Sequence, residues 1–226
     1  MTDTVTIPNI ELKSARLGYN NSDLLQDANL SISAGEICLI YGPNGSGKTT
    51  LGMTLVGILP LKSGERINHF HRIGYVPQVN RLDRQYPLAL RDVVAMGLRE
   101  VFTLNPWKRL TQERQVQEKV LHALSNVGLA EHARLHFSEA SGGQLQRALI
   151  ARALISEPDF ILLDEPFSNL DQQGRKQVRE ILSRVNQEKK VALAIVDHLR
   201  DDEHFYQRYF LIQDGEVQET RGSGDR

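Results

Sequence analysis

The stretch Gly42-Pro43-Asn44-Gly45-Ser46-Gly47-Lys48-Thr49 decides the fold, because it fits the pattern G-x-x-x-x-G-K-[ST]. A short continuous apolar run, 36–41, precedes it, and a helical pattern, 51–59, follows it and is closed by Pro60. Glycines let the backbone turn its N–H groups inward around phosphates, and the following helix adds its positive N-terminal end. The sequence therefore predicts a strand, loop and helix unit of a parallel sheet, with a phosphate-binding loop at its centre.

Two side chains give this loop its chemistry. Lys48 would supply a full charge to the β- and γ-phosphate oxygens of a nucleotide, and the hydroxyl of Thr49 would hold Mg²⁺. The competing interpretation is a glycine-rich turn with a surface lysine, which the flanking strand and helix patterns disfavour. The predicted nucleotide-binding residues are Gly42, Pro43, Asn44, Gly45, Ser46, Gly47, Lys48, Thr49 and Thr50.

Outside this unit, the apolar residues indicate two kinds of sheet and a helical insertion. Alternation near 10–12 and 29–32 predicts an antiparallel, half-exposed sheet. Between 88 and 154 the period is 3.6, and we read about 85–155 as helical. Further strands, which alternate with helical patterns, are predicted at 72–76, 160–163, 191–196 and 209–212.

These elements predict an α/β fold: a P-loop NTPase core with a mixed sheet, an antiparallel β subdomain and a helical subdomain. We expect a single domain over 1–226, with about 1–84 and 156–220 forming the core and β subdomain and about 85–155 the helical subdomain. The tail from Glu219, rich in glycine and charge, is expected to be frayed, with 221–226 beyond the packed domain.

The composition excludes several function classes. The chain has 226 residues and a net charge of -1, and its 27 basic residues are scattered among 28 acidic ones, so no nucleic-acid partner is predicted. No stretch approaches the ~18 apolar residues of a membrane-spanning helix, and 1–9 lacks the features of a signal peptide, so we expect a cytoplasmic protein. The single Cys38, inside an apolar run, is predicted to be a small buried core residue.

A second acidic motif follows the predicted strand at 160–163. Asp164, at the end of a buried apolar strand, would lie beside the phosphate loop and act on Mg²⁺ directly or through water. Glu165 would then polarise the attacking water as a general base. The alternative is a strand that ends in a solvated turn, and pairing with the phosphate loop argues against it.

The third motif is Ser141-Gly142-Gly143-Gln144, ahead of an amphipathic helix at 145–155. Ser141 and Gln144 form a capping-box pattern, which can satisfy two backbone N–H groups at the helix start. The pattern does not explain the two glycines, which leave N–H groups bare and make a second anion site.

Across nearly its whole length the chain resembles the nucleotide-binding subunits of ABC transporters, whose motifs occur here in family order. The resemblance assigns Gln78 to the Q-loop, Ser141 to Gln144 to the signature, and His198 to the switch. Ser168 to Asp171 match the D-loop, with Ser168 and Asp171 as its predicted site residues. Tyr19 matches the aromatic residue that stacks on adenine, and a core tyrosine at a strand end is the competing interpretation.

The resemblance implies an ATPase that uses ATP and Mg²⁺ and acts as a head-to-tail homodimer. The signature of one copy would cover the γ-phosphate held by the other, and Asp171 would communicate across the dimer. The implied Mg²⁺ set is Thr49, Gln78 and Asp164, and the implied catalytic set is Glu165, His198, Gln78 and Lys48. Integral permease subunits would hold the ATPase on the inner face of the membrane, with an extracytoplasmic binding protein as indirect partner.

Two departures from the family pattern stand out. Ala140 replaces the usual leucine, so we expect looser packing of the signature helix. Leu199 follows His198 where the family usually has aspartate, and Asp197 precedes it.

The segment 83–97, with 107–109 beyond it, is similar to the ATPases of zinc and manganese importers. Iron-chelate and cobalamin importers have a related segment, and non-transport members in iron-sulfur assembly or cell division remain alternatives. Two histidine pairs, His69 with His71 and His132 with His136, are read as solvated surface, because neither has a third ligand nearby.

Overall fold

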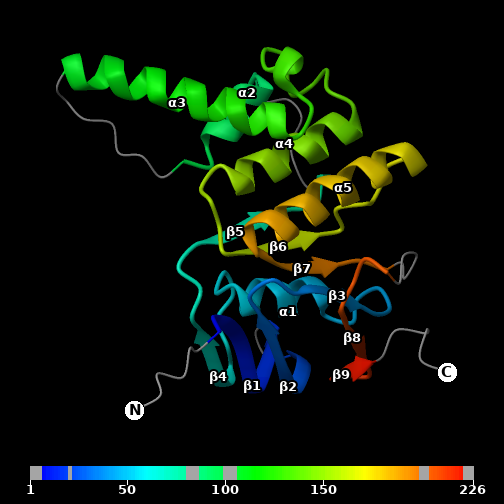
Figure 1. Cartoon of the computed structure of the whole chain (residues 1–226). Coiled ribbons are helices and arrows are strands. Elements are labelled where there is room, and N and C mark those ends of the chain that lie inside the picture. Colours follow the sequence, from blue (N-terminus) through cyan, green and yellow to red (C-terminus); the bar gives the residue numbers. More distant parts are fainter. Residues whose placement is uncertain (1–6, 20–21, 80–86, 99–105, 199–203, 221–226) are drawn as a thin grey trace.

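The computed structural model describes residues 7–19, 22–79, 87–98, 106–198 and 204–220, and of 106–112 the backbone alone. In these residues the chain forms two sheets with helices packed on them in layers (Figure 1). Helices α2 to α5 lie on one face of a six-stranded sheet, and α1 lies on the other face with the three-stranded sheet beyond it. The confirmed fold class is thus α/β, with a mixed sheet, an antiparallel sheet and helices.

The six-stranded sheet has the order β5-β6-β7-β3-β8-β9, and only the last pair is antiparallel. Because the central strands are covered on both faces, they read as continuous apolar runs. Their bounds are β3 Ile37–Tyr41, β5 Ile73–Val76, β6 Phe160–Asp164, β7 Ala192–Val196, β8 Arg208–Gln213 and β9 Glu216–Thr220. The antiparallel sheet has the order β2-β1-β4, with β1 Asn9–Tyr19, β2 Ser22–Ser33 and β4 Ser63–Asn68.

Two hydrophobic cores lie on the two faces of the six-stranded sheet. Alternate residues of one strand enter different cores: Leu39 packs with the α2–α5 layer, whereas Cys38 and Ile40 pack with α1 and the antiparallel sheet. Cys38 is fully buried, as predicted, and burial raises the pKa of its thiol. Each fully buried Leu or Ile contributes about 2 kcal/mol from removal of apolar surface from water. The helices are α1 Lys48–Leu55, α2 Leu90–Ala95, α3 Pro106–Asn126, α4 Gly142–Leu154 and α5 Gln172–Lys189, with a short 3-10 turn at Ala130–His132.

Several predicted boundaries were wrong. The helix after the phosphate loop ends at Leu55 rather than at 59, because Gly57 takes a left-handed conformation at φ 79° and its N–H bonds to Thr54. Within the predicted helical insertion, α2 stops at Ala95, and Gly97 lies against α4, where a Cβ would be 2.0 Å from the Arg152 carbonyl oxygen.

Other differences lie in the β structure and at the signature helix. Helix α4 begins at Gly142, three residues earlier than expected. Strands β4 and β9 were not predicted, because exposed polar residues dominate both. Glu219 was expected in a frayed tail, yet it belongs to β9 and its carboxylate accepts hydrogen bonds from Arg208 at 2.8 Å. Residues 221–226 lie outside the described residues.

Candidate nucleotide-binding site

The strand order brings the phosphate loop and two carboxylates to one edge of the sheet. Strands β6, β7 and β3 are neighbours and run parallel, so their carboxyl ends lie side by side. The phosphate loop follows β3, Asp164 ends β6, and Asp197 follows β7. This edge is where open α/β sheets hold ligands.

Glycines shape the phosphate loop as its pattern predicts. At Gly42 (φ 153°) a Cβ would lie 2.2 Å from the carbonyl oxygen of Ile212, so only glycine fits between β3 and β8. Gly47 (φ 100°) is the N-cap of α1, and no side chain caps this helix start. The N-terminus of α1 therefore has no side-chain acceptor of its own.

Lys48 is almost fully buried in this loop. Its ammonium donates hydrogen bonds to the carbonyl oxygens of Gly42 at 2.9 Å and Pro43 at 2.7 Å. Burial lowers the pKa of Lys48, while the carboxylates of Glu165, Asp164 and Asp197 act in the opposite direction. The surface-lysine interpretation is thus wrong, because the charge lies inside the loop where phosphates would bind.

Two further observations fit a phosphate group and a magnesium ion. The hydroxyl of Ser46 is buried and has no hydrogen-bond partner among the described residues, as expected if a phosphate oxygen is its acceptor. The Thr49 hydroxyl donates to Oδ1 of Asp164 at 3.0 Å, and Asp164 is 1% exposed. A hydroxyl and a carboxylate oxygen at this spacing are a donor set that Mg²⁺ prefers.

Glu165 is the meeting point of the remaining catalytic candidates. Its Oε2 accepts a hydrogen bond from the Gln78 amide at 2.5 Å, and its Oε1 lies 3.1 Å from Nε2 of His198. The backbone at Glu165 has φ 49°, a left-handed conformation that costs free energy in a residue other than glycine and clusters at functional sites. Gln78, Glu165 and His198 come from three segments far apart in sequence, and the structure brings them together.

Asp197 is a site residue whose importance the sequence reasoning missed. It was noted only as a departure beside His198, but its side chain is 5% exposed and its charge acts on Lys48. A carboxylate directly after an apolar strand that pairs with the phosphate-loop strand was the signal that could have identified it.

Tyr19 lies at the end of β1, beside the start of α1. Its ring is 52% exposed, and its hydroxyl accepts a hydrogen bond from Thr50 at 3.4 Å. The core-tyrosine interpretation is therefore wrong, and an exposed aromatic face stands next to the phosphate loop.

The signature stands on α4, on the opposite face of the sheet from α1 (Figure 1). The predicted capping box is present: the Ser141 hydroxyl accepts from the Gln144 N–H at 3.2 Å, and the Gln144 side chain accepts from the Ser141 N–H at 2.8 Å. Ala140, just before it, is buried in the core at 4% exposure.

The D-loop lies next to the signature. An added Cβ on Gly142 would come 3.7 Å from the Asn169 carbonyl oxygen, an ordinary contact. The Ser168 hydroxyl donates to the Glu165 carbonyl oxygen at 2.9 Å, and Asp171 caps α5 by accepting the Gly174 N–H at 2.8 Å. Both D-loop candidates thus have local structural contacts in the single chain.

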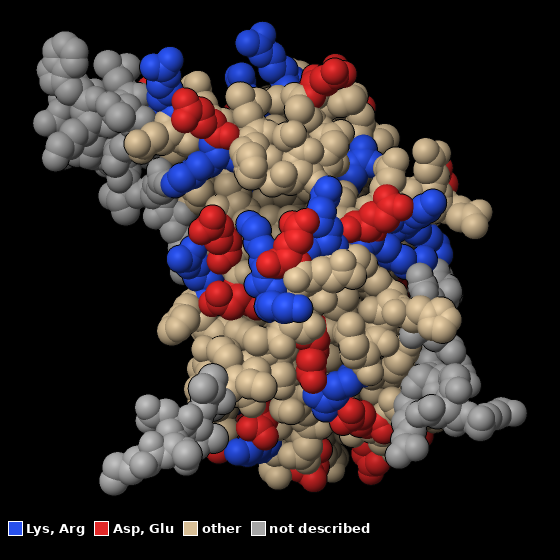
Figure 2. Space-filling view, viewed as in Figure 1, with Lys and Arg blue, Asp and Glu red and all other residues tan. Residues whose placement is uncertain are grey.

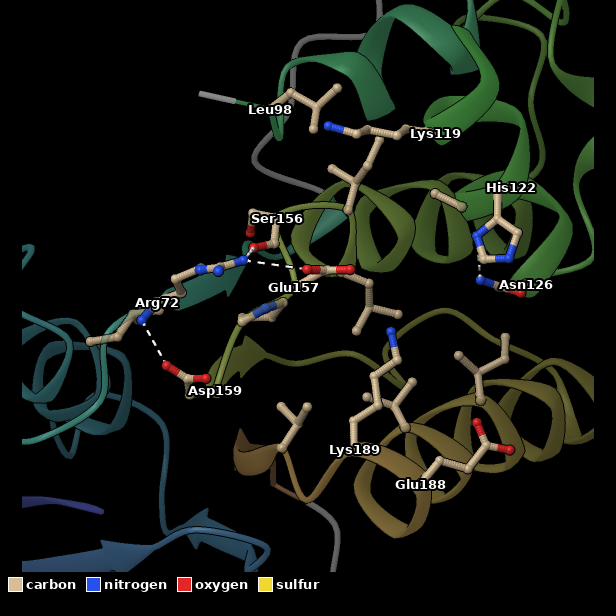
Figure 3. Close-up of a pocket in the computed structure, with 18 of the residues that line it drawn as sticks. Arg72, Leu98, Lys119, His122, Asn126, Ser156, Glu157, Asp159, Glu188 and Lys189 are labelled. Atoms are coloured by element: carbon tan, nitrogen blue, oxygen red, sulfur yellow. Dashed lines mark hydrogen bonds and ion pairs between the residues drawn. The ribbon is translucent and has the colours of Figure 1, made fainter. Parts of the chain in front are cut away.

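A separate hollow of about 1290 Å³ lies at the other edge of the sheet. Figure 3 shows its lining near the starts of β5 and β6, where Arg72 pairs with Glu157 at 3.5 Å and Asp159 accepts the Arg72 N–H at 3.0 Å. Lys189 projects from α5 toward Glu157, and Lys119 projects from α3 toward Leu98. The hollow lies at the amino ends of the parallel strands, so it is not part of the phosphate site.

Charge on the surface is mixed. Figure 2 shows blue and red side chains interspersed over the middle of this face, without a broad region of one sign. Among the described residues, no group of three or more His, Cys, Asp or Glu side chains could hold a metal ion. The ring of His69 bonds to Asn9 at 2.6 Å. No helix in the described ranges is long and apolar enough to cross a membrane.

Fold and site together define a nucleotide-binding protein of the P-loop class. A family model described as ABC transporter matches residues 25–168. The manganese transport system ATP-binding protein MntB of Bacillus subtilis is 32% identical over 210 residues, which cover 90% of this chain and 82% of that protein. The zinc import ATP-binding protein ZnuC of Cereibacter sphaeroides is 37% identical over 178 residues, or 78% and 67% of the two chains.

Solved structures agree with this match. A chain from an inward-facing metal-chelate type ABC transporter has a TM-score of 0.81 at 26% identity and covers 95% of this chain and 84% of its own length. A dimeric ATP-binding cassette bound to ADP and Pi in a post-hydrolysis state has a TM-score of 0.78 at 27% identity, with 95% and 99% covered. The chain belongs to the ABC transporter family, and it is an ATP-hydrolysing subunit of that family.

Proposed function

We propose that this ATPase powers the import of a divalent transition metal, zinc or manganese. The observation that carries the proposal is the likeness to a manganese transport and a zinc import ATPase over 90% and 78% of the chain. The subunit would act with separate membrane permeases, which receive metal from an external binding protein. Of the segment 83–97 that first suggested metal import, residues 83–86 lie outside the described residues, and α2 lies within the rest.

The site supports a division of labour in hydrolysis. Lys48 would leave the loop carbonyls and bind the β- and γ-phosphate oxygens, while Ser46 and the N-terminus of α1 supply hydrogen bonds. Glu165 would orient and deprotonate the attacking water, and Gln78 and His198 hold its carboxylate in place. Tyr19 would stack on the adenine ring.

Thr49 and Asp164 would hold Mg²⁺. Gln78, whose amide donates to Glu165, would contact the ion from the side on which Glu165 lies. When bound, the ion neutralises charge on the phosphate oxygens. The 3.0 Å contact between Thr49 and Asp164 supports this assignment, because one ion could contact both oxygens.

The signature would act on ATP bound by a second copy of the chain. Within one chain, α1 and α4 cover opposite faces of the sheet, so each helix start lacks the other as a neighbour (Figure 1). The fold itself does not require glycine at 142 and 143, because an added Cβ would meet its nearest atoms at 3.7 and 3.8 Å. Glycines that the fold of one chain does not require are expected where the phosphate of ATP bound by a second copy comes close to the backbone. Asp171, beside the signature, would then face the partner.

The variant Glu165→Gln tests this mechanism. The amide cannot accept a proton, so hydrolysis should stop while ATP binding persists, and ATP with Mg²⁺ should yield a homodimer by sedimentation. The matched control is Glu157→Gln, which changes a carboxylate at the opposite edge of the sheet and should hydrolyse ATP like wild type. Near-normal turnover by Glu165→Gln would remove Glu165 from its role, and a monomer at saturating ATP would contradict the shared site.

Metal content tests the substrate. Cells that lack this subunit should accumulate less zinc or manganese under scarcity, and the Lys48→Ala form should not restore uptake. A second candidate substrate, a metal chelate, is favoured by the TM-score of 0.81 to a metal-chelate type transporter. Unchanged zinc and manganese with a loss of iron-chelate uptake would therefore select the second candidate.

A further inference from the structure

Asp197 lies where the strand of the switch meets the phosphate-loop strand. It follows β7 directly, and its N–H donates to the carbonyl oxygen of Ile40 at 3.1 Å, two residues before Gly42. Its side chain is 5% exposed. A buried carboxylate costs free energy unless hydrogen bonds and nearby cations compensate it. The contacts of Asp197 therefore show what stabilises its buried charge.

The carboxylate contacts the backbone of the switch histidine. Oδ1 of Asp197 accepts the His198 N–H at 2.7 Å, at the short end of N–H···O distances and as expected for a charged acceptor. The bond fixes the direction in which the chain leaves β7. The imidazole of His198 is 42% exposed, so few packing contacts restrain it, yet it reaches Glu165 at 3.1 Å.

The remaining groups around Asp197 belong to the site. Val196, the residue before Asp197, pairs with Asp164 in the sheet. The Val196 carbonyl oxygen accepts the Glu165 N–H at 2.8 Å. The opposing cation is Lys48, on which Asp197 acts together with Asp164 and Glu165. The end of β7 is therefore in direct contact with the residues that would bind and attack the phosphate.

We propose that Asp197 is a positioning residue for ATP hydrolysis: by accepting the His198 N–H it holds the switch so that the imidazole meets Glu165. The inference rests on the proposed role of His198 in the site. It requires an acceptor oxygen at position 197 and not a negative charge, and this separates it from a general electrostatic effect on Lys48.

Steady-state hydrolysis by Asp197→Ala and Asp197→Asn tests the proposal. Asp197→Ala removes the acceptor, so kcat should fall about tenfold or more, the scale of a misplaced catalytic group, while the KM for ATP changes less than about twofold. Asp197→Asn keeps an acceptor oxygen and should recover most of the lost kcat. In a His198→Ala background, Asp197→Ala should cause no further loss, because both changes remove the same interaction.

Asp159→Ala is the matched control. Asp159 also lies beside a buried strand and accepts backbone N–H groups, those of His71 and Arg72 at 2.9 and 3.0 Å, but at the opposite edge of the sheet. It should lower the melting temperature and leave kcat unchanged. Two results would overturn the proposal: full activity of Asp197→Ala, or Asp197→Asn as inactive as Asp197→Ala. If His198→Ala itself hydrolyses ATP normally, the proposed role of the histidine fails first and the two failures are told apart.

Discussion

The starts of α1 and α4 look alike in sequence and differ in structure. Glycines lie at or just before both helix starts, and both starts were predicted to bind an anion through backbone N–H groups. The start of α1 has no side-chain cap, whereas Ser141 and Gln144 close the start of α4 with a capping box. A buried lysine accompanies the first start, and the second has no acidic or basic residue in its first turn.

The first helix start is surrounded by polar groups of its own chain, and the second is not. The loop before α1 lies beside a buried lysine, two hydroxyls and a buried carboxylate of the same chain. The capping box satisfies backbone N–H groups at the start of α4 as long as no ligand binds there. We therefore expect changes at the first start to weaken nucleotide binding strongly, and changes at the second to spare binding and prevent the two chains from acting together.

The largest effect is expected for Lys48→Ala. Loss of two charge-assisted hydrogen bonds to phosphate, about 1.5 kcal/mol each, should weaken ATP binding on the order of 100-fold and remove turnover. Titration calorimetry with ATP measures this, and Lys189→Ala, a lysine at the far hollow, is the control. Tight ATP binding by Lys48→Ala would erase the distinction between the two helix starts.

Gly143→Ala should have opposite effects on stability and activity. A Cβ there meets Leu170 at 3.8 Å without a clash, and alanine in a helix is favoured over glycine by up to about 1 kcal/mol. The melting temperature should hold or rise, and monomer ATP binding should stay normal. ATP-driven dimerisation and hydrolysis should fall at least tenfold, roughly the effect of misplaced catalytic groups. Loss of ATP binding by the monomer would contradict this assignment.

Ala140→Leu tests how tightly the core is packed next to the start of α4. Alanine was expected to loosen the signature helix, but it is 4% exposed inside the core. Leucine must then push neighbours apart, and such overpacking costs about 1–3 kcal/mol. Thermal unfolding should show a lower melting temperature for Ala140→Leu, with Leu121→Ala, an exposed apolar residue, as the neutral comparison. A higher melting temperature would show that a void exists there.

The smallest expected effect belongs to Gln144→Ala. It removes one half of the capping box, the bond from the Ser141 N–H, and should lower stability by about 0.5–1 kcal/mol. Denaturant unfolding measures the change, and Gln172→Ala at the first turn of α5 is a control, because Asp171 caps that helix. An unchanged free energy of unfolding would mean that the box is not formed in solution.

The sequence predicted the local structure around the phosphate loop and the signature better than the edges of the fold. Phosphate-loop spacing, the apolar strand before Asp164 and the capping box follow local rules, and all three are present. Strands β4 and β9 were missed because their stability comes from pairing with β1 and β8 and not from their own polar residues. Helix α1 ends early because of the conformation of Gly57. The sequence pattern could not show this, because the helical pattern continues up to Pro60.

The meeting of Gln78, Glu165 and His198 needed knowledge beyond spacing. Each is separated from the others by a helix or more, and the family resemblance supplied their grouping. Asp197 was missed because its hydrogen-bond partner is a backbone N–H and not another side chain. A residue that acts through the main chain leaves no motif of side chains to find.

Arg208 links the antiparallel sheet to the edge of the six-stranded sheet. One guanidinium binds Glu219 on β9, Glu36 before β3 and the carbonyl oxygen of Ser31 on β2, and it stacks over Phe210 at 5.0 Å. The hydrogen bonds to Glu219, together with the charge of Glu36, raise the pKa of Arg208. The antiparallel sheet is thereby tied to the edge of the six-stranded sheet. A force that reaches one sheet should therefore be passed to the other through the Arg208 side chain.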